Sequence, residues 1–402
     1  MSVTPQTIPR HLKAVALRQM EGFPAIAITG PRQSGKTTLA RELGGDRPYA
    51  SLENPDIRRF ADEDPRGFLS QFPDGAVLDE IQRCPPLFSY LQGILDSDRR
   101  MGRFILTGSQ QFGMVEAITQ SLAGRVSLLS LWPFSLSELQ DVNRAPASLD
   151  TLLQAGLFPP IHDRPVDPDA WLQSYVATYL ERDVRMSINV QDLASFQRFL
   201  QLCAGRIGQL VNLSSLASDT GISRATAEAW LSVLQAGFLV FLARPHFTNV
   251  SKRLIKAPKI YFTDPGLAAW LIGIHTTEHL RTHPLRGAIF ENWLMTELAK
   301  ASAHAGRVPA VGFLRDKEGH EIDAIIESGN VLHAIEAKSG QTIPSDAFKG
   351  LDFRRPKLQP GKTSRSWLVY GGDSAQHRES VTVLPWHGLA PLLKELRMEL
   401  GR

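Results

Sequence analysis

The pattern of hydrophobic and polar positions along the chain predicts an α/β protein. Short apolar runs predict buried strands in the first third of the sequence, at residues 25–29, 76–80, 103–107 and 126–131. Helical patterns are expected over 38–43, 168–202 and 285–301, and a further strand over 331–338. In the long helical stretch, Trp171, Tyr175, Thr178 and Tyr179 fall on one face.

Residues 30–37 match the pattern G-x-x-x-x-G-K-[ST] and lie between the first predicted strand and a helix. In this context the glycines turn backbone N–H groups around a triphosphate, and the helix N-terminus adds positive potential. Lys36 is expected to reach the β- and γ-phosphates and Thr37 to ligate Mg²⁺. The predicted cofactors are therefore ATP and Mg²⁺, and the predicted nucleotide-binding residues are Gly30, Pro31, Arg32, Gln33, Ser34, Gly35, Lys36, Thr37, Thr38 and Asp79.

The strand at 76–80 ends in two carboxylates, about forty residues after this loop. Asp79 is expected to hold Mg²⁺ through its water shell, and Glu80 to polarise the attacking water. A third strand, 103–107, ends in Gly108-Ser109-Gln110. Ser109 is the candidate γ-phosphate sensor, with Thr107 and Gln110 behind it; the alternative is a plain turn.

Arg125 lies just before the strand at 126–131. It is a candidate to reach the γ-phosphate in cis, or to act in trans on a neighbouring subunit, which implies a homo-oligomer. The alternative is a solvated surface arginine.

Together these motifs resemble a large prokaryotic family of AAA-type ATPases. The matching segments are 30–37, 78–82, 105–109, 121–125, 131–139 and 175–184. The resemblance runs over nearly the whole chain and implies an AAA-type αβα core with an extra strand between the two Walker strands. It favours a catalytic role for Arg125 and implies no defined cellular role.

The middle of the chain predicts a linker with short helical pieces, followed by a helix-turn-helix. A short helix at 214–219 precedes a turn at Gly221, and Ser223 is the expected N-cap of a second helix over 224–236. Gly237 is expected to close that helix, and a strand at 238–242 to serve as a wing. Three charged residues lie upstream: Arg182, Asp183 and Arg185. They are expected to form a solvated helix face; the alternative is that they couple the ATPase to the helix-turn-helix.

A basic segment follows the predicted wing, comprising Arg244, Lys252, Arg253, Lys256 and Lys259. Its charges suit backbone phosphates, which favours DNA as a partner bound without sequence preference. The second helix offers few side chains for reading bases, chiefly Arg224, Ser232 and Gln235, and it carries Glu228. The alternative is a protein-binding or lid module.

A second set of candidate chemical groups lies near the C-terminus: Glu291 on a helix, Asp323 ending a strand, and Glu336 and Lys338 on the next strand. Period-2 geometry places Glu336 and Lys338 on one face, and a hairpin brings Asp323 beside them. This arrangement resembles the restriction-endonuclease-like superfamily. The resemblance implies that Asp323 and Glu336 ligate Mg²⁺, that Glu291 is a further or water-mediated ligand, and that Lys338 activates water. The alternative is a scaffold without chemistry.

Composition narrows the class of protein further. The net charge of +3 is too small to indicate a nucleic-acid partner, so any basic surface must be local. Cys84 and Cys203 are the only cysteines, which excludes a disulfide framework and a Cys-based zinc site. Residues 1–10 lack an apolar core of signal-peptide type, and the longest apolar run, 237–243, is too short to cross a bilayer. We expect a cytoplasmic protein.

These observations predict four parts in the 402-residue chain: an AAA-type ATPase domain (1–140), a linker and helical lid (141–200), a winged helix-turn-helix (201–260) and a restriction-endonuclease-like α/β domain (261–402). The expected function is ATP hydrolysis coupled to action on DNA, with Mg²⁺-dependent phosphodiester cleavage as a second activity. The alternatives are an ATP-dependent regulatory switch that acts on a partner protein, and an ATPase that binds DNA without cutting it.

Overall fold

The structure is a computed structural model, and it describes residues 7–109, 114, 118, 120–180, 192–246, 257–315, 320–354, 363–378 and 380–400. The chain forms two compact units. The N-terminal unit comprises Gln6–Phe134 and Leu234–Leu239, and the C-terminal unit comprises Ser135–Val233 and Val240–Arg402.

The described strands of the N-terminal unit form one parallel sheet in the order β2-β3-β4-β1-β5. Their bounds are β1 Ala25–Thr29, β2 Tyr49–Ser51, β3 Val77–Asp79, β4 Phe104–Gly108 and β5 Val126–Ser130. The strand β4 separates β3 from β1, so the predicted extra strand between the two Walker strands is confirmed. The inner strands β1, β3 and β4 are buried on both faces, so they appear in the sequence as mainly apolar runs.

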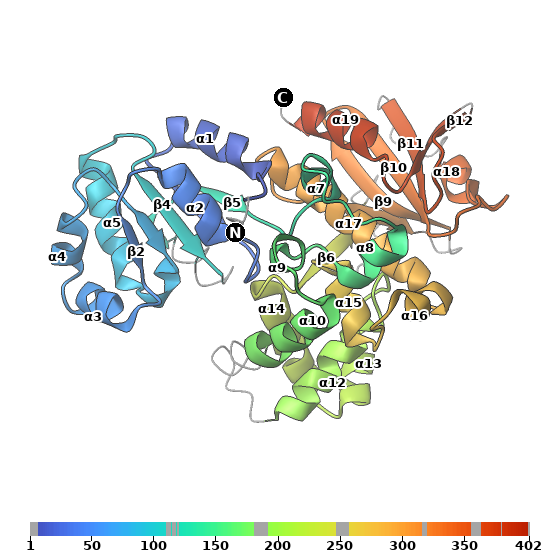
Figure 1. The fold of residues 1–402 in the computed structure, drawn as a ribbon, viewed down its shortest axis with the longest axis horizontal. Helices are drawn as coiled ribbons and strands as arrows, with labels where there is room; N and C mark the ends of the chain where they lie inside the picture. Colours follow the sequence, from blue (N-terminus) through green and yellow to red (C-terminus); the bar gives the residue numbers. More distant parts are fainter. Residues whose placement is uncertain are drawn as a thin grey trace. The chain divides into compact units, whose positions relative to one another are not determined.

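Helices cover both faces of this sheet and make an αβα sandwich (Figure 1). In β1, Ile26 and Ile28 point to the face covered by α1 (Leu12–Gly22) and α2 (Lys36–Gly44). Ala25 and Ala27 point to the opposite face. That face is covered by α3 Pro55–Glu63, α4 Pro65–Ser70 and α5 Pro86–Ser97.

The C-terminal unit begins with short helices, of which the second and third lie in the predicted linker and the fourth begins the helical stretch expected over 168–202. They are α7 Leu136–Gln140, α8 Leu149–Ala155, α9 Pro159–Asp163 and α10 Pro168–Tyr175, which continues as a π-helical turn, Val176–Leu180. Trp171 and Tyr175 stack with ring centroids 5.0 Å apart, and both contact Phe158. The charged residues Arg182, Asp183 and Arg185 lie outside the described residues.

Three helices follow: α12 Leu193–Ala204, α13 Leu213–Thr220 and α14 Arg224–Ala236. The predicted N-cap is confirmed, because Ser223 Oγ accepts a hydrogen bond from the Thr226 N–H at 3.0 Å. The helix ends just before Gly237 as expected, but the left-handed residue is Phe238, with φ 54°. Hydrogen bonds from the N–H groups of Phe238 and Leu239 to Gln235 and Leu234 stabilise this ending.

The described strands of the C-terminal unit form a mixed sheet in the order β12-β13-β11-β10-β9-β8-β6-β7. Their bounds are β6 Val240–Pro245, β7 Lys259–Phe262, β8 Gly312–Arg315, β9 Glu321–Ser328, β10 Val331–Lys338, β11 Thr363–Tyr370, β12 Gln376–Arg378 and β13 Val381–Pro385. The strand expected as a wing is β6, and it pairs with both β7 and β8. It therefore belongs to the same sheet as the C-terminal strands.

The remaining helices pack on this sheet or on the helices beside it (Figure 1). They are α15 Pro265–Leu271, α16 Thr277–Thr282, α17 Arg286–His304, α18 Lys349–Arg354 and α19 Ala390–Leu400. Helix α17 contacts β10 and α19 and is buried over most of its length. Among the helices that the structure describes, not one is both long and apolar enough to cross a membrane.

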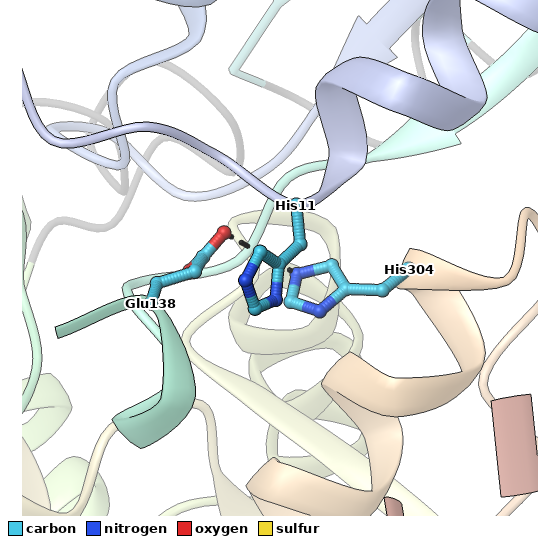
Figure 2. Close-up of side chains that lie close together, drawn as sticks. All are labelled: His11, Glu138 and His304. Atoms are coloured by element: carbon cyan, nitrogen blue, oxygen red, sulfur yellow. Dashed lines mark ion pairs between the residues drawn. The ribbon is translucent and has the colours of Figure 1, made fainter. Parts of the chain in front are cut away.

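Polar groups attach α7 to α17 inside the C-terminal unit. Glu138 closes a capping box with Ser135, and its Oε1 lies 3.6 Å from His304 Nε2 (Figure 2). The Leu136 N–H donates to Glu297 Oε2 at 3.1 Å, and Glu297 also pairs with Lys300 at 2.9 Å. Because buried charges are costly when unpaired, these partners fix the position of α7.

Replacing Gly30 by Ala should lower the free energy of unfolding of the N-terminal unit by about 3 kcal/mol, since overpacking and backbone strain add. Gly30 has φ +150°, and a Cβ there would lie 2.1 Å from the Leu131 carbonyl oxygen. Differential scanning calorimetry measures the change. The matched control is Gly93→Ala in α5, where a Cβ meets nothing within 4 Å. This control should raise stability by about 0.5–1 kcal/mol, and equal effects of the two changes would contradict the prediction.

Candidate functional site

The loop between β1 and α2 has the backbone geometry of a phosphate-binding loop. Gln33 and Gly35 have positive φ angles of 61° and 91°, and Gly35 directly precedes α2. The first N–H groups of α2 therefore face the loop, where an anion is favoured. Ser34 Oγ is buried and has no hydrogen-bond partner within the described part of the chain, so it is available to a ligand.

Lys36 lies inside this loop and is 5% exposed. Its Nζ donates hydrogen bonds to the carbonyl oxygens of Gly30 at 3.0 Å and Pro31 at 2.8 Å. Burial lowers the pKa of Lys36 to about 8, although the carboxylates of Glu80 and Asp79 oppose that shift. A phosphate group would give this ammonium a charged acceptor in place of two carbonyls, as the sequence predicts.

Asp79, at the end of β3, accepts hydrogen bonds from three hydroxyl groups. Thr37 Oγ1 donates at 3.0 Å, Tyr49 OH at 2.8 Å and Thr107 Oγ1 at 2.5 Å. Thr37 and Asp79, the residues expected to bind Mg²⁺, are thus adjacent and offer the oxygen ligands that this ion prefers. The sequence did not point to Tyr49; it reaches Asp79 because β2 pairs with β3.

Glu80 is positioned beside this pair by an unusual backbone conformation. Its φ is 54°, in the left-handed region that non-glycine residues rarely adopt. Its Oε2 accepts from Ser109 Oγ at 2.8 Å and from Gln82 Nε2 at 2.5 Å. Ser109 therefore lies beside the predicted catalytic carboxylate, and backbone strain of this kind is common at functional sites. Gln110 lies outside the described residues.

The cis role considered for Arg125 does not fit the fold. Arg125 precedes β5, and its carbonyl oxygen accepts from the N–H of Ala25, the first residue of β1. It therefore lies at the amino end of the parallel strands, whereas the phosphate-binding loop follows their carboxyl ends. Its guanidinium pairs with Asp96 at 2.6 Å. The role in trans stays a prediction.

In the C-terminal unit, the hairpin of β9 and β10 brings together Asp323, Glu336 and Lys338. Ala324 pairs with Ile335, so the next positions, Asp323 and Glu336, face each other. The Ala337 N–H donates to Asp323 Oδ2 at 2.9 Å, and Lys338 Nζ lies 3.1 Å from Glu336 Oε2. These contacts confirm the arrangement that the strand period predicts.

Glu291, on α17, has different neighbours. Its Oε1 accepts from Lys259 Nζ at 3.0 Å and from Tyr261 OH at 2.5 Å. Lys259 also pairs with Glu321 and is 2% exposed. Its assignment to a DNA-binding basic surface is therefore wrong, because β7 buries this side chain among carboxylates. No sequence pattern linked these groups; only the acidic residues near Asp323 were a signal.

The carboxylates of this region shift one another's pKa values. Burial, and then the neighbouring charge of Asp323, raise the pKa of Glu291 to about 7 and that of Glu336 to about 9. For Lys338, burial lowers the pKa, but Asp323 and Glu336 outweigh it, so the pKa is raised. Closely spaced carboxylates of this kind favour a bound cation, because it relieves their mutual repulsion.

Three family models match the chain in succession: an AAA domain at residues 22–140, a domain of unknown function (DUF8612) at 146–278, and a domain of unknown function (DUF4143) at 286–389. Uncharacterized proteins of Mycobacterium tuberculosis (Rv2008c) and Mycobacterium bovis (Mb2031c) are each 33% identical over 373 residues. These alignments cover 91% of this chain and 81% of each relative.

The chain belongs to this prokaryotic family of AAA-type P-loop ATPases with a C-terminal DUF4143 domain. The family assignment identifies the protein as an ATPase that binds ATP. Among solved structures, the Walker-type ATPase PABY2304 of Pyrococcus abyssi has a TM-score of 0.43 and 14% identity, covering 66% of this chain and 96% of that one.

Replacing Glu80 by Gln should leave ATP binding intact and lower phosphate release by about 100-fold or more, since the amide cannot polarise water. Lys36→Ala should abolish binding itself. Fluorescent-nucleotide titration and a phosphate-release assay separate the two effects. Glu63→Gln, at an exposed position of α3, is the control and should change neither quantity. Unchanged hydrolysis in Glu80→Gln would remove this residue from the catalytic site.

Proposed function

We propose that this ATPase couples ATP hydrolysis to action on DNA, and that its C-terminal domain cuts phosphodiester bonds with Mg²⁺. The observation that carries the proposal is the convergence of Asp323, Glu336 and Lys338 at one end of the β9–β10 hairpin. Two carboxylates and an ammonium on one face are the groups that metal-assisted cleavage requires.

The donor set fits the proposed metal ion. Asp323 and Glu336 supply the carboxylate oxygens that Mg²⁺ prefers. When bound, the ion would polarise a phosphoryl oxygen and lower the pKa of a bound water. Lys338 is 33% exposed, so a substrate and water can approach it from solvent. Its ammonium would orient the attacking water and stabilise the charge that develops on the phosphate.

The helices α13 and α14 form the helix-turn-helix through which we propose that DNA binds. Arg224 and Ser232 are exposed on α14, but Glu228 is exposed between them, which disfavours a sequence-reading surface. Arg244 is exposed at the end of β6. The other proposed phosphate contacts, Lys252, Arg253 and Lys256, lie outside the described residues.

A homo-oligomer is part of the proposal, because a catalytic Arg125 would have to act on a neighbouring subunit. The Arg125 side chain is 29% exposed, and its partner Asp96 is also on the surface. A γ-phosphate from a second subunit would have to replace Asp96 as its partner. This exchange of one anion for another is the way in which an arginine finger would engage.

Wild type should nick supercoiled DNA in the presence of Mg²⁺ and ATP, and Lys338→Ala should lower the rate by at least about 100-fold, since it removes the ammonium that would orient the attacking water and stabilise the developing charge. Conversion of supercoiled plasmid to open circles, with phosphate release in parallel, measures both activities. Lys349→Ala is the matched control, because it removes an exposed lysine at the start of nearby α18.

The outcomes of that experiment separate the proposal from its rivals. Phosphate release without any nicking by wild type would contradict nuclease activity and favour a regulatory switch. Equal nicking by wild type and Lys338→Ala would show that the cleavage comes from another site or from a contaminant.

Charge reversal of Lys252, Arg253 and Lys256 together should weaken DNA binding and reduce the slope of log K against log salt by about 3, since each basic side chain neutralises about one phosphate. Fluorescence anisotropy at several salt concentrations gives this slope. The control reverses three exposed charges elsewhere, at Arg59, Arg99 and Lys394. Equal slopes in both triple variants would remove this segment as the DNA-binding surface.

A further inference from the structure

The acidic site of the C-terminal unit has two ends with different surroundings. At the outer end, Asp323 is half-buried and Lys338 is 33% exposed. At the inner end, Glu291 and Glu321 converge on the ammonium of Lys259, whose side chain is 2% exposed. The inner end therefore holds a buried ammonium, whereas the ammonium at the outer end is accessible to solvent.

The backbone fixes the position of Lys259. Its strand pairs with β6, where Ala243 is its partner, and it also forms a bridge with Leu210 on the other side. Its Nζ lies 3.0 Å from Glu291 Oε1 and 5.3 Å from the centre of the Phe313 ring. A buried side chain between two strand neighbours has little freedom to move away when a metal ion approaches.

One carboxylate oxygen of Glu291 already has two donors within the protein. Oε1 accepts from Lys259 and from Tyr261, and Oε2 faces the backbone of Gly208. The Glu291 side chain is 18% exposed, so with Lys259 in place little room is left for a hydrated ion. Since Mg²⁺ keeps several water ligands, this end of the site suits an ammonium better than a metal.

We propose that Lys259 Nζ takes the place of a metal ion between Glu291 and Glu321, so that this site binds a divalent cation only through Asp323 and Glu336. The proposal corrects the expectation that Glu291 is a metal ligand. The statement that Asp323 and Glu336 bind the cation rests on the proposed function, whereas the exclusion of a metal ion by Lys259 does not. A metal ion bound to Glu291 would lie close to the Lys259 ammonium, which is 3.0 Å from the same carboxylate. The two positive charges would repel each other strongly, and this repulsion excludes the metal ion.

The test is Mn²⁺ titration of the full chain without nucleotide, by isothermal calorimetry and by the electron paramagnetic resonance signal of free Mn²⁺. All variants carry Asp79→Asn, so that the N-terminal unit contributes no metal site. We expect one bound Mn²⁺ with Lys259 present and two in Lys259→Met, because the lost ammonium leaves two buried carboxylates to be neutralised. Lys349→Met removes an exposed positive charge near the same site and should keep one.

The four stoichiometries distinguish this inference from the proposed function. Two ions with Lys259 present, or one in both proteins, would overturn the inference. No ion with Lys259 present and one in Lys259→Met would support the exclusion by Lys259 and overturn the metal site at Asp323 and Glu336. No ion in either protein would overturn both.

A second variant covers the case in which Lys259→Met fails to fold. Glu291→Gln keeps Lys259 and its contact with Glu321, and it should change the Mn²⁺ dissociation constant by less than about threefold. Asp323→Asn should raise that constant by at least about tenfold, as loss of a ligand does. A loss in Glu291→Gln as large as that in Asp323→Asn would show that Glu291 is a ligand and overturn the inference.

Discussion

The architecture of the C-terminal unit depends on the ion pairs that the buried ammonium of Lys259 makes with two carboxylates. A buried cation is costly unless carboxylates surround it, and Glu291 and Glu321 meet that need. Lys259 lies in the segment that matches DUF8612, and both carboxylates lie in the segment that matches DUF4143. The pairing of β6 with β8 joins the same two segments in one sheet. The two family segments therefore fold as one compact unit.

In the predicted ATP site, too, buried charged side chains are stabilised by hydrogen-bond partners, here carbonyl and hydroxyl groups. Lys36 donates to carbonyls of its own loop, and Asp79 accepts from three hydroxyl groups. These contacts satisfy buried polar groups that would otherwise be costly, and they keep the side chains near the positions that a nucleotide requires. Glu80 adds a strained backbone to this arrangement. Nucleotide binding at the predicted site would therefore exchange hydrogen-bond partners among side chains that are already paired.

Local features of the fold were predictable because neighbouring residues determine them. The bounds of β1, β10 and α14 agree with the prediction, since strand runs, a serine N-cap and a following glycine act within a few residues. The ending of α14 shows the limit of such signals. Phe238, not Gly237, takes the left-handed conformation, because the carbonyls of the last turn must be satisfied and the ring is buried.

By itself the sequence determined the phosphate-binding loop, the Walker carboxylates and the hairpin that joins Asp323 to Glu336, because each depends on short spacing or strand period. Only the tertiary structure decided the positions of Arg125, Tyr49 and Lys259. Parallel pairing of β5 with β1 places Arg125 at the amino end of the strands, and pairing of β2 with β3 places Tyr49 beside Asp79. Sheet pairing buries Lys259 among carboxylates from distant segments. Such contacts depend on register between residues far apart in the chain, which no local pattern encodes.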